Sequence, residues 1–505
     1  MLAIAKTDDW LSKPTAALGD FSTYFYGYFL AFLLIGVGLY FTARMYGIQF
    51  RLFRHMVASL TNSRDGQGGG ISSFQAFTIG LASRVGTGNI IGVALAIIMG
   101  GPGAVFWMWV VALVGMATAF VEATLAQMYK VANPDGSFRG GPAYYITRGL
   151  KMKPLAVAFA AVIIFVFGFA YEATQANAIS GIMEHTFNVP TWVTGVGLLV
   201  ITAPIIFGGM RQVAKVSEWI APIMALGYVL LAAVILLLNI TAIPGALLQI
   251  FKGAFGLDQA LAGMAGGFTA AALNGIKRGL FSNEAGEGSV PNAAAAATTA
   301  HPVNQGFIQS MGVFVDTLLV CTATALIVLL SGVYNPATAR TGQFSAGTLT
   351  SISVTSQLGG WAQYLMAAMI FVFAYSSLLG NYTYAEINDS FLRGATKKLN
   401  HTWLRVMILV ATYVGAVASL DFVWNLADVV MGIMATINIF AITIMGRWAF
   451  GALRDWESQY AQLKAGEIDE IRFVSTDNKF LPGKLPGDVW SSENAGVHVN
   501  DRAEA

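Results

Sequence analysis

Long apolar runs separated by short polar segments make up most of this chain. Eleven of these runs approach or exceed the roughly 20 apolar residues that a helix needs to cross a bilayer, where no water satisfies the backbone. They cover residues 21–46, 71–100, 103–129, 155–184, 190–207, 216–238, 262–285, 305–330, 361–387, 402–420 and 422–448. The pattern predicts an all-α polytopic membrane protein with 11 transmembrane helices.

Basic residues are unevenly divided between alternate connections of these runs. Cytoplasmic loops are enriched in Lys and Arg. If the amino terminus lies outside, 14 basic residues fall on the inward side: Arg44, Arg51, Arg54, Arg64, Lys130, Arg139, Arg148, Lys151, Lys153, Arg211, Lys215, Arg393, Lys397 and Lys398. Only 4 fall on the outward side: Lys6, Lys13, Lys252 and Arg340. We therefore expect a multi-pass protein of the cell's inner (plasma) membrane, with its amino terminus outside and its carboxyl terminus in the cytoplasm.

Charge is scarce except at the carboxyl end. Charged residues make up 11% of the 505 residues, against roughly 25% in soluble proteins. Residues 451–505 hold 16 of them, and this segment reads as a cytoplasmic tail with little fixed structure. The 29 basic and 27 acidic side chains nearly balance, so no net charge favours nucleic acid as a partner. The expected surrounding is the lipid bilayer.

Two of the predicted spans are interrupted by Gly and polar residues. The second span carries Ser-Arg-Val-Gly-Thr-Gly-Asn at 83–89, and the seventh carries Asn-Glu-Ala-Gly-Glu-Gly at 283–288. Gly favours unwinding, and buried polar groups are costly without partners. Irregular backbone of this kind is tolerated within a membrane where it lines a cavity.

The interruptions stand at matching places in two sets of five spans. If the first span is set aside, each interruption lies in the first helix of its set, in residues 71–240 and 262–450. Because five is odd, the second set must be inserted upside down relative to the first. Interrupted segments at corresponding positions of inverted halves indicate the binding site of a secondary transporter. The alternative is two unrelated kinks.

Five motifs carry a resemblance to a known family. They are SRVGTGNIIGVA from Ser83, GGPGAVFWMW from Gly100, GGPAYYI from Gly140, GLFSNEAG from Gly279 and GVFVDT from Gly312. Together they span residues 70–450 and resemble the signatures of the sodium/alanine (alanine or glycine) cation symporter family, in the amino acid/polyamine/organocation superfamily. The resemblance implies one extra N-terminal helix within residues 1–70, a LeuT-like 5+5 inverted repeat, and sodium-driven uptake of small neutral amino acids. Arg84 departs from the family pattern, where a small or neutral residue is expected.

The first interruption suits a carboxylate. Amide groups freed at a helix break, and the positive end of the half-helix that follows, attract anions. Gly86, Thr87, Gly88 and Asn89 supply such amides to the substrate.

The seventh and fourth spans supply the other expected substrate contacts. In the seventh, Phe281 offers an apolar wall, and Ser282 and Asn283 offer polar partners. In the fourth, Glu172 and Gln175 share a helical face. Gln175 is predicted to contact the substrate, with pairing to another helix an equal alternative. Glu172 is an intramembrane carboxylate, a type of residue that is functional by default; whether it holds a proton, an ion pair or nothing transported stays open.

The superfamily resemblance also implies a sodium site. It places one cation between carbonyls near Ala82 and Val85 and the ninth span, at Phe373, Ser376 and Ser377. The alternative for the two hydroxyls is hydrogen bonding between helices. Asn89 is a candidate ligand for a second cation, while Glu122, Asp316 and Asp428 are expected to make structural pairs.

The sequence lacks the motifs typical of other classes of membrane protein. No Gly-Lys-Ser or Gly-Lys-Thr occurs, so ATP is not the expected driver. None of the five histidines pairs at i, i+4 to bind haem or zinc, so we expect neither an enzyme nor a cofactor. The sequence thus favours a sodium symporter for a small neutral amino acid, with a proton-coupled transporter of the same fold or a passive channel as alternatives.

Overall fold

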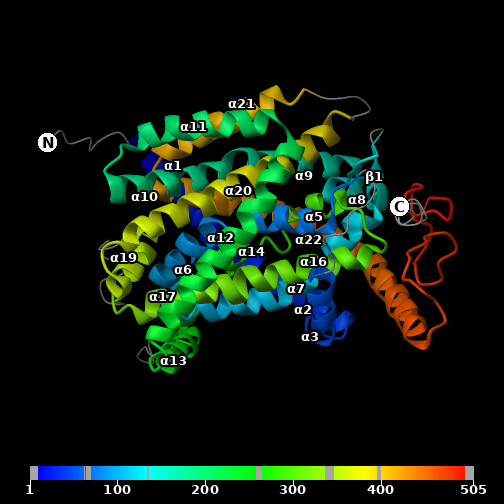
Figure 1. Ribbon diagram of the computed structural model, residues 1–505, viewed down its shortest axis with the longest axis horizontal. Helices are drawn as coiled ribbons and strands as arrows, with labels where there is room; N and C mark the ends of the chain where they lie inside the picture. The colour runs from blue at the N-terminus through cyan, green and yellow to red at the C-terminus, as the bar shows by residue number, and fades with distance from the viewer. Residues whose placement is uncertain are drawn as a thin grey trace.

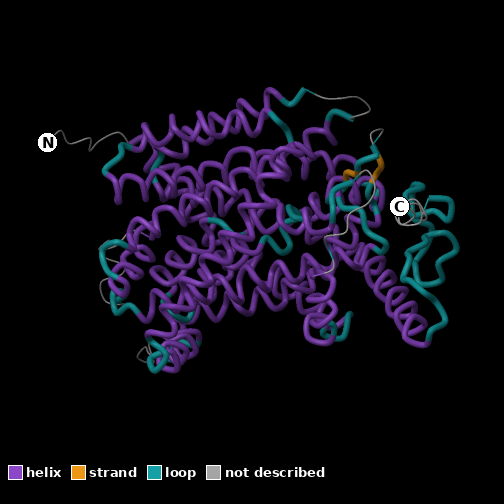
Figure 2. Tube along the Cα trace, in the orientation of Figure 1, coloured by secondary structure: helices purple, strands orange, loops and turns teal. Residues whose placement is uncertain are grey.

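The computed structural model describes residues 9–61, 63, 70–133, 136–257, 264–335, 346–394 and 400–494. The named secondary-structure elements within them are helices, apart from a short hairpin of β1 (Val131–Ala132) and β2 (Phe138–Arg139). The long helices run roughly side by side, with α13 and α19 at one end and α8, β1 and the carboxyl-terminal segment at the other (Figures 1 and 2). The basic residues Lys6, Arg64, Arg340, Lys397 and Lys398 lie outside the described residues.

The helices follow the apolar runs of the sequence. In chain order they are α1 (Asp9–Phe25), α2 (Ala31–Arg44), α3 (Ile48–Arg51), α4 (Phe53–Thr61), α5 (Ser73–Arg84), α6 (Val93–Gly100), α7 (Ala104–Met128), α8 (Pro142–Tyr145), α9 (Lys153–Phe165), α10 (Tyr171–Phe187), α11 (Thr191–Phe207), α12 (Met210–Leu238), α13 (Ile243–Ala254), α14 (Met264–Asn283), α15 (Pro291–Ala296), α16 (Pro302–Val313), α17 (Thr322–Leu330), α19 (Ala346–Leu358), α20 (Ala362–Leu392), α21 (Thr402–Val417) and α22 (Leu420–Ala465). Wider π-helical turns continue several of them: η1 (Tyr26–Leu30), η2 (Gly88–Gly92), η3 (Ile146–Leu150), η4 (Val166–Ala170) and η5 (Phe314–Cys321).

Seven continuous helical segments in the described part of the chain are long and apolar enough to cross a membrane. The bent pair of α5 and η2–α6 makes an eighth. The expectation of an all-helical protein with several transmembrane helices is therefore confirmed. The other three predicted spans coincide with α11, α21 and α14, of which α11 and α21 are shorter apolar helices. The count of eleven stays a prediction.

The first break lies where the sequence places it. α5 begins with a capping box between Ser72 and Gln75 and ends at Arg84. Val85 leaves the helical conformation (φ −80°, ψ 81°), and the chain turns by 47° before it continues as η2 and α6. The predicted interruption of the second span is thus a real break in the helix.

The second break is longer and more irregular. α14 ends at Asn283, and helix resumes only at Pro291 in the six-residue α15. Gly286 and Gly288 adopt φ of 100° and 80°, and Glu284 adopts a φ of 55°. Positive φ favours Gly, so the two glycines explain why the chain unwinds here.

Small residues let the broken helices approach their neighbours. A Cβ at Gly279 of α14 would stand 3.3 Å from the Cα of Met108 on α7. Close backbone approach through small residues is how membrane helices pack without a hydrophobic driving force. The first half of the second broken helix is therefore packed directly against α7.

The described part of the carboxyl-terminal tail, up to residue 494, has a fixed structure, contrary to the sequence expectation. Phe473, Leu485 and Trp490 are buried. The Trp490 indole donates a hydrogen bond to the Gln127 carbonyl (2.8 Å), and the Phe473 amide donates to the Ala300 carbonyl (3.0 Å). The prediction failed because a few aromatic side chains outweigh the polar average of the segment when a neighbouring surface receives them.

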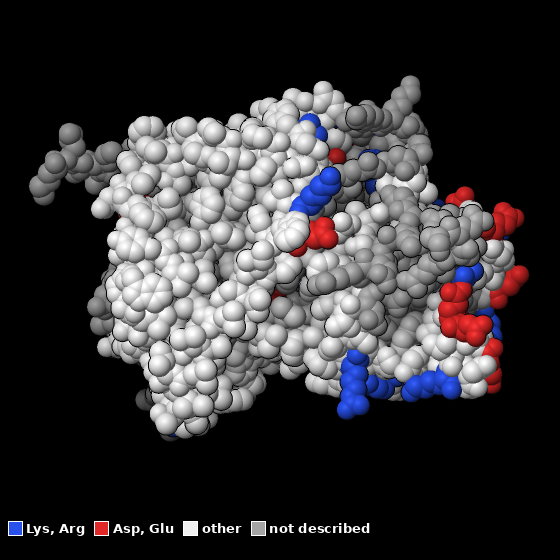
Figure 3. Space-filling model, viewed as in Figure 1, with Lys and Arg blue, Asp and Glu red and all other residues white. Residues whose placement is uncertain are grey.

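Charged side chains gather mainly toward the end of the molecule that carries this tail, whereas most of the face seen in Figure 3 is uncharged. At that end Arg51 of α3 pairs with Glu457 of α22 at 2.6 Å. Elsewhere large apolar side chains such as Trp219 and Phe32 are exposed. An apolar surface of this extent fits contact with lipid.

Candidate functional site

The two helix breaks meet in the interior of the protein. Asn89, at the start of η2, donates from its Nδ2 to the Ser282 hydroxyl (3.1 Å) at the end of α14 and to the Asp316 carboxylate (2.6 Å) on η5. The Asn89 Oδ1 accepts from the Gly86 amide at 2.9 Å. One side chain therefore connects the first break, the second break and η5.

The amides of the first break are arranged around oxygen acceptors. The Thr87 amide donates to Oε1 of Gln175 on α10 at 3.3 Å. Gln175 is buried, so the sequence-predicted residue of the fourth span does face the first break. An oxygen acceptor thus fits at the amides that the sequence assigned to a substrate carboxylate.

Both glycines of this break stand against other residues of the predicted site. A Cβ at Gly86 would clash with the Ser377 hydroxyl and approach the Gln175 side chain. A Cβ at Gly88 would lie 3.0 Å from the ring of Phe281. The absence of side chains at these two positions lets α10, α14 and α20 approach the break.

Aromatic rings surround Phe281. The ring centroids of Tyr171 on α10 and Trp424 on α22 both lie 4.7 Å from that of Phe281. Tyr171 and Trp424 were not among the residues predicted from the sequence, although Tyr171 is next to Glu172, which shares a helical face with Gln175. Asn283, the other predicted polar residue, turns to its own break and to η5: its Oδ1 accepts from the Ala285 amide (3.0 Å) and its Nδ2 donates to Thr317 (3.3 Å).

The residues proposed for sodium separate into two groups. The Ser377 hydroxyl lies 2.8 Å from the Ala82 carbonyl of α5 and 3.2 Å from the Phe373 carbonyl, so three of the predicted oxygen atoms are close together. The Ser376 hydroxyl also contacts the Phe373 carbonyl (2.9 Å), but its other partner is Met224 of α12 (3.2 Å). Ser377, rather than Ser376, faces the first break.

Four buried carboxylates line the second break and its surroundings, and each has hydrogen-bond donors. Glu284 accepts from Ser83 (2.7 Å) and Ser289 (2.6 Å), Glu287 from Tyr171 (3.1 Å), Glu122 from the Gly286 amide (3.1 Å) and from Asn438, and Asp316 from Asn89, Ser282 and Thr317. From the sequence, Glu122 and Asp316 were expected only to make structural pairs. Apart from Thr317, which is next to Asp316 in the chain, their partners come from other segments, so a local pattern in the sequence could not reveal this network.

Arg84 supplies the positive charge of this region. Its Nη1 donates to the Gln309 carbonyl of α16 at 3.2 Å. Its guanidinium interacts electrostatically with all four of the carboxylates just described. Arg84 therefore compensates the protein's own acids.

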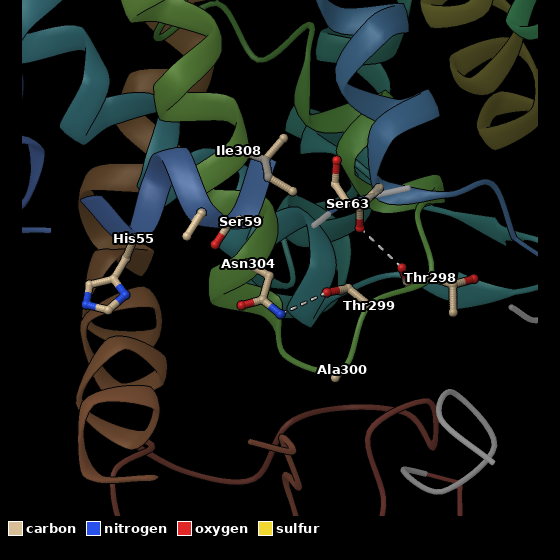
Figure 4. Close-up of a pocket in the computed structure, with 10 residues that line it drawn as sticks. His55, Ser59, Ser63, Thr298, Thr299, Ala300, Asn304 and Ile308 are labelled. Carbon is tan, nitrogen blue, oxygen red and sulfur yellow. Dashed lines mark hydrogen bonds between the residues drawn. The ribbon is translucent and has the colours of Figure 1, made fainter. Parts of the chain in front are cut away.

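A cavity of about 340 Å³ lies beside the segment that follows α15 (Figure 4). Its polar lining includes His55, Ser59 and Ser63 from the segment of α4 and the residues after it, and Thr299 and Asn304 from the segment after α15, with Asn304 donating to Thr299 at 3.4 Å. None of the predicted substrate or sodium residues lines it. The cavity is therefore separate from the meeting point of the two breaks.

Comparison of this sequence with known proteins identifies the family to which the chain belongs. The model of the sodium:alanine symporter family matches residues 12–470. The amino-acid carrier protein AlsT of Bacillus subtilis is 44% identical over 92% of this chain and 95% of its own length. The probable sodium/glutamine symporter GlnT of the same organism is 44% identical over 85% and 88%, and the sodium/proton-dependent alanine carrier protein of Bacillus sp. PS3 is 36% identical over 81% and 94%. As the motifs around the two breaks predicted, this chain belongs to the sodium:alanine symporter family, a family of transporters.

Proposed function

We propose that the protein is a sodium-coupled symporter that imports a small neutral amino acid, alanine or glycine, by alternating access. The observation that carries the proposal is the direct contact between the two breaks, through Asn89 and Ser282. In the proposed architecture, one N-terminal helix precedes two inverted five-helix repeats of the LeuT-like type, in the inner membrane with the amino terminus outside. Discontinuous helices at the centre of such repeats hold substrate and ion.

The substrate carboxylate binds at the amides of Gly86 to Asn89. The positive end of η2–α6 favours an anion there, and the Gly86 and Thr87 amides already donate to the side-chain oxygens of Asn89 and Gln175, whose place a carboxylate takes. The Gln175 side chain, which already faces the Thr87 amide, contacts the same substrate group. We expect the rings packed around Phe281 to limit the substrate to amino acids with a small side chain, such as alanine and glycine.

Sodium binds between the Ala82 carbonyl of α5, the Val85 carbonyl just after this helix, and the Phe373 carbonyl and Ser377 hydroxyl of α20, with Ser376 nearby. Sodium at this site and the substrate carboxylate share residues 82–89 of the first break. A cation that orders this segment lowers the cost of ordering it for the substrate, and linkage makes the effect reciprocal. This shared segment is the physical basis of the coupling.

Uptake of labelled alanine, glycine and glutamine into membrane vesicles tests the proposal. Alanine or glycine should accumulate above equilibrium only when an inward sodium gradient is imposed. Accumulation driven by a proton gradient without sodium would instead support the proton-coupled alternative, and equilibration without accumulation would support a channel. The name of GlnT makes glutamine the third substrate to compare.

A further inference from the structure

Glu172 is a fully buried acid without a charged partner among the described residues. It lies in the first turn of α10 with 0% of its surface exposed. Neither carboxylate oxygen has a hydrogen bond within the part of the chain that the structure describes. The polar side chain that interacts with it is Asn381 on α20, whose Nδ2 also lacks a partner among the described residues.

The other buried acids near the breaks differ from Glu172 in two respects. Each of Glu122, Glu284, Glu287 and Asp316 accepts at least one hydrogen bond, and each interacts with Arg84. Among the described residues Glu172 has no charged partner and no close hydrogen bond, and the neutral Asn381 side chain is the polar group that interacts with it.

The elements packed against α10 do not supply a counter-charge. No charged side chain of the described residues interacts electrostatically with Glu172. Several ionisable side chains of α20 and α22 have partners elsewhere, in the pairs Tyr375–Ile201, Tyr382–Arg405, Glu386–His401, Asp389–Arg393 and Asp428–Arg278, and Tyr171 of α10 itself pairs with Glu287. Tyr384 interacts with Ser83 and Glu284. The described parts of α11, α19 and η4 carry no ionisable residue.

An ionised carboxylate without donors or a cation is strongly disfavoured in a low-dielectric interior. The buried carboxylate of Glu172 is therefore stable when a cation neutralises it. A sodium ion and a proton both meet this need, and both are small enough for a site inside a helix bundle.

The position of Glu172 connects it to both proposed sites. It precedes Gln175 by three residues on α10, which is about one helical turn. Asn381 follows Ser377 by four residues on α20 and accepts a hydrogen bond from the Ser83 hydroxyl at 3.3 Å. A cation at Glu172 thus lies next to helical turns that contact the first break.

We propose that Glu172 is a further cation site of the transporter, and that its carboxylate takes up one monovalent cation, a sodium ion or a proton, in each transport cycle. The inference rests on the proposed function, because it adds a second cation to the one assigned to Ser377. Asn381 positions the carboxylate and is the neutral partner of the loaded site.

The test counts ions with the purified protein in proteoliposomes. Uptake of labelled sodium and of labelled alanine is measured together, and a pH-sensitive dye inside the vesicles records proton entry. The variant is Glu172→Gln, which keeps the shape of the side chain and removes its charge. The matched control is Glu184→Gln, which removes an exposed carboxylate from the same helix.

The wild-type protein should take up at least two cations, sodium and protons together, for each alanine, and the control should do the same. If sodium occupies Glu172, the variant's ratio of sodium to alanine falls by one. If a proton occupies it, alanine-driven proton entry is lost and the sodium ratio is unchanged.

Unchanged sodium and proton ratios in Glu172→Gln would overturn the inference. A wild-type total of one cation per alanine would also overturn it, and that count does not depend on the folding of the variant. Failure of the proposed function looks different, because the wild-type vesicles would then show no sodium-driven uptake of any amino acid tested.

Discussion

Gly88 lies at a close contact between the first break and the end of α14. A Cβ there would already stand 3.0 Å from the Phe281 ring, so Gly88→Leu forces the breaks apart at the proposed carboxylate site. We expect uptake to fall at least about tenfold while membrane insertion is retained, since overpacking of this kind costs about 1–3 kcal/mol. The control is Gly197→Leu on α11, where a Cβ meets nothing within 4 Å. Wild-type transport by Gly88→Leu would contradict the assignment.

The two neighbouring serines of α20 should differ in their effect on sodium. Ser377 faces the Ala82 carbonyl, whereas Ser376 faces Met224. Loss of one oxygen ligand worth about 1.4 kcal/mol corresponds to a tenfold change in affinity. Ser377→Ala should therefore raise the sodium concentration for half-maximal uptake about tenfold, and Ser376→Ala should raise it less. Equal shifts in the two variants would argue against a sodium site at Ser377.

Residues within a break could be found from the sequence, and their partners from distant helices could not. Gly86, Asn89 and Ser282 stand out because Gly and polar residues interrupt an apolar run. Trp424 and Asp316 lie in other helices, and their contacts depend on how those helices pack. Chain order carries no direct signal for that packing.

Among the structural elements, the carboxyl-terminal tail differs most from its prediction, because its polar composition indicated little fixed structure. Trp490 is 2% exposed, and Lys130 lies 4.9 Å from the centre of its ring. Trp490→Ala should remove about 3–5 kcal/mol of packing from the tail and make residues 466–494 sensitive to limited proteolysis. Trp219→Ala, at a position on α12 that is 74% exposed, is the control. Equal protease resistance of the two variants would show that Trp490 does not hold the tail in place.

Attachment of the tail should also depend on pH through His301, whose ring packs against Phe473 of the tail with 5.0 Å between the ring centroids. Its Nδ1 accepts from the Val303 amide (3.2 Å) and its Nε2 contacts Asp455 (3.1 Å), an arrangement that needs a neutral ring. Burial lowers the pKa of His301, while Asp455 partly raises it. Because the folded form binds the proton more weakly than the unfolded chain, stability is lost as the pH falls below about 6.5.

Protection of the tail from protease should thus weaken in acid, and His301→Asn should reduce this pH dependence. A wild-type tail whose protease resistance is constant from neutral pH to pH 5 would contradict the role given to His301.

At the scale of the whole molecule, the apolar runs were sufficient to predict a helical membrane protein. The positions of both breaks also followed from the sequence, because Gly and polar residues occur together there within an apolar run. The count of eleven spans and the inverted repeat depend on α11, α14 and α21, which are short or carry polar residues such as Lys277 and Arg278. Such helices are stabilised by their neighbours, so apolar length alone does not identify them as spans.

The central claim is that the meeting point of the two breaks binds the amino acid and its driving ion together. The most direct measurement is an experimental structure of the protein with alanine and sodium bound. We predict that the alanine carboxylate lies at the amides of residues 86–89, with its methyl group toward Phe281, and that sodium lies against Ser377 and the Ala82 carbonyl. Alanine bound elsewhere, for example in the cavity between His55 and Thr299, with both breaks empty, would contradict it.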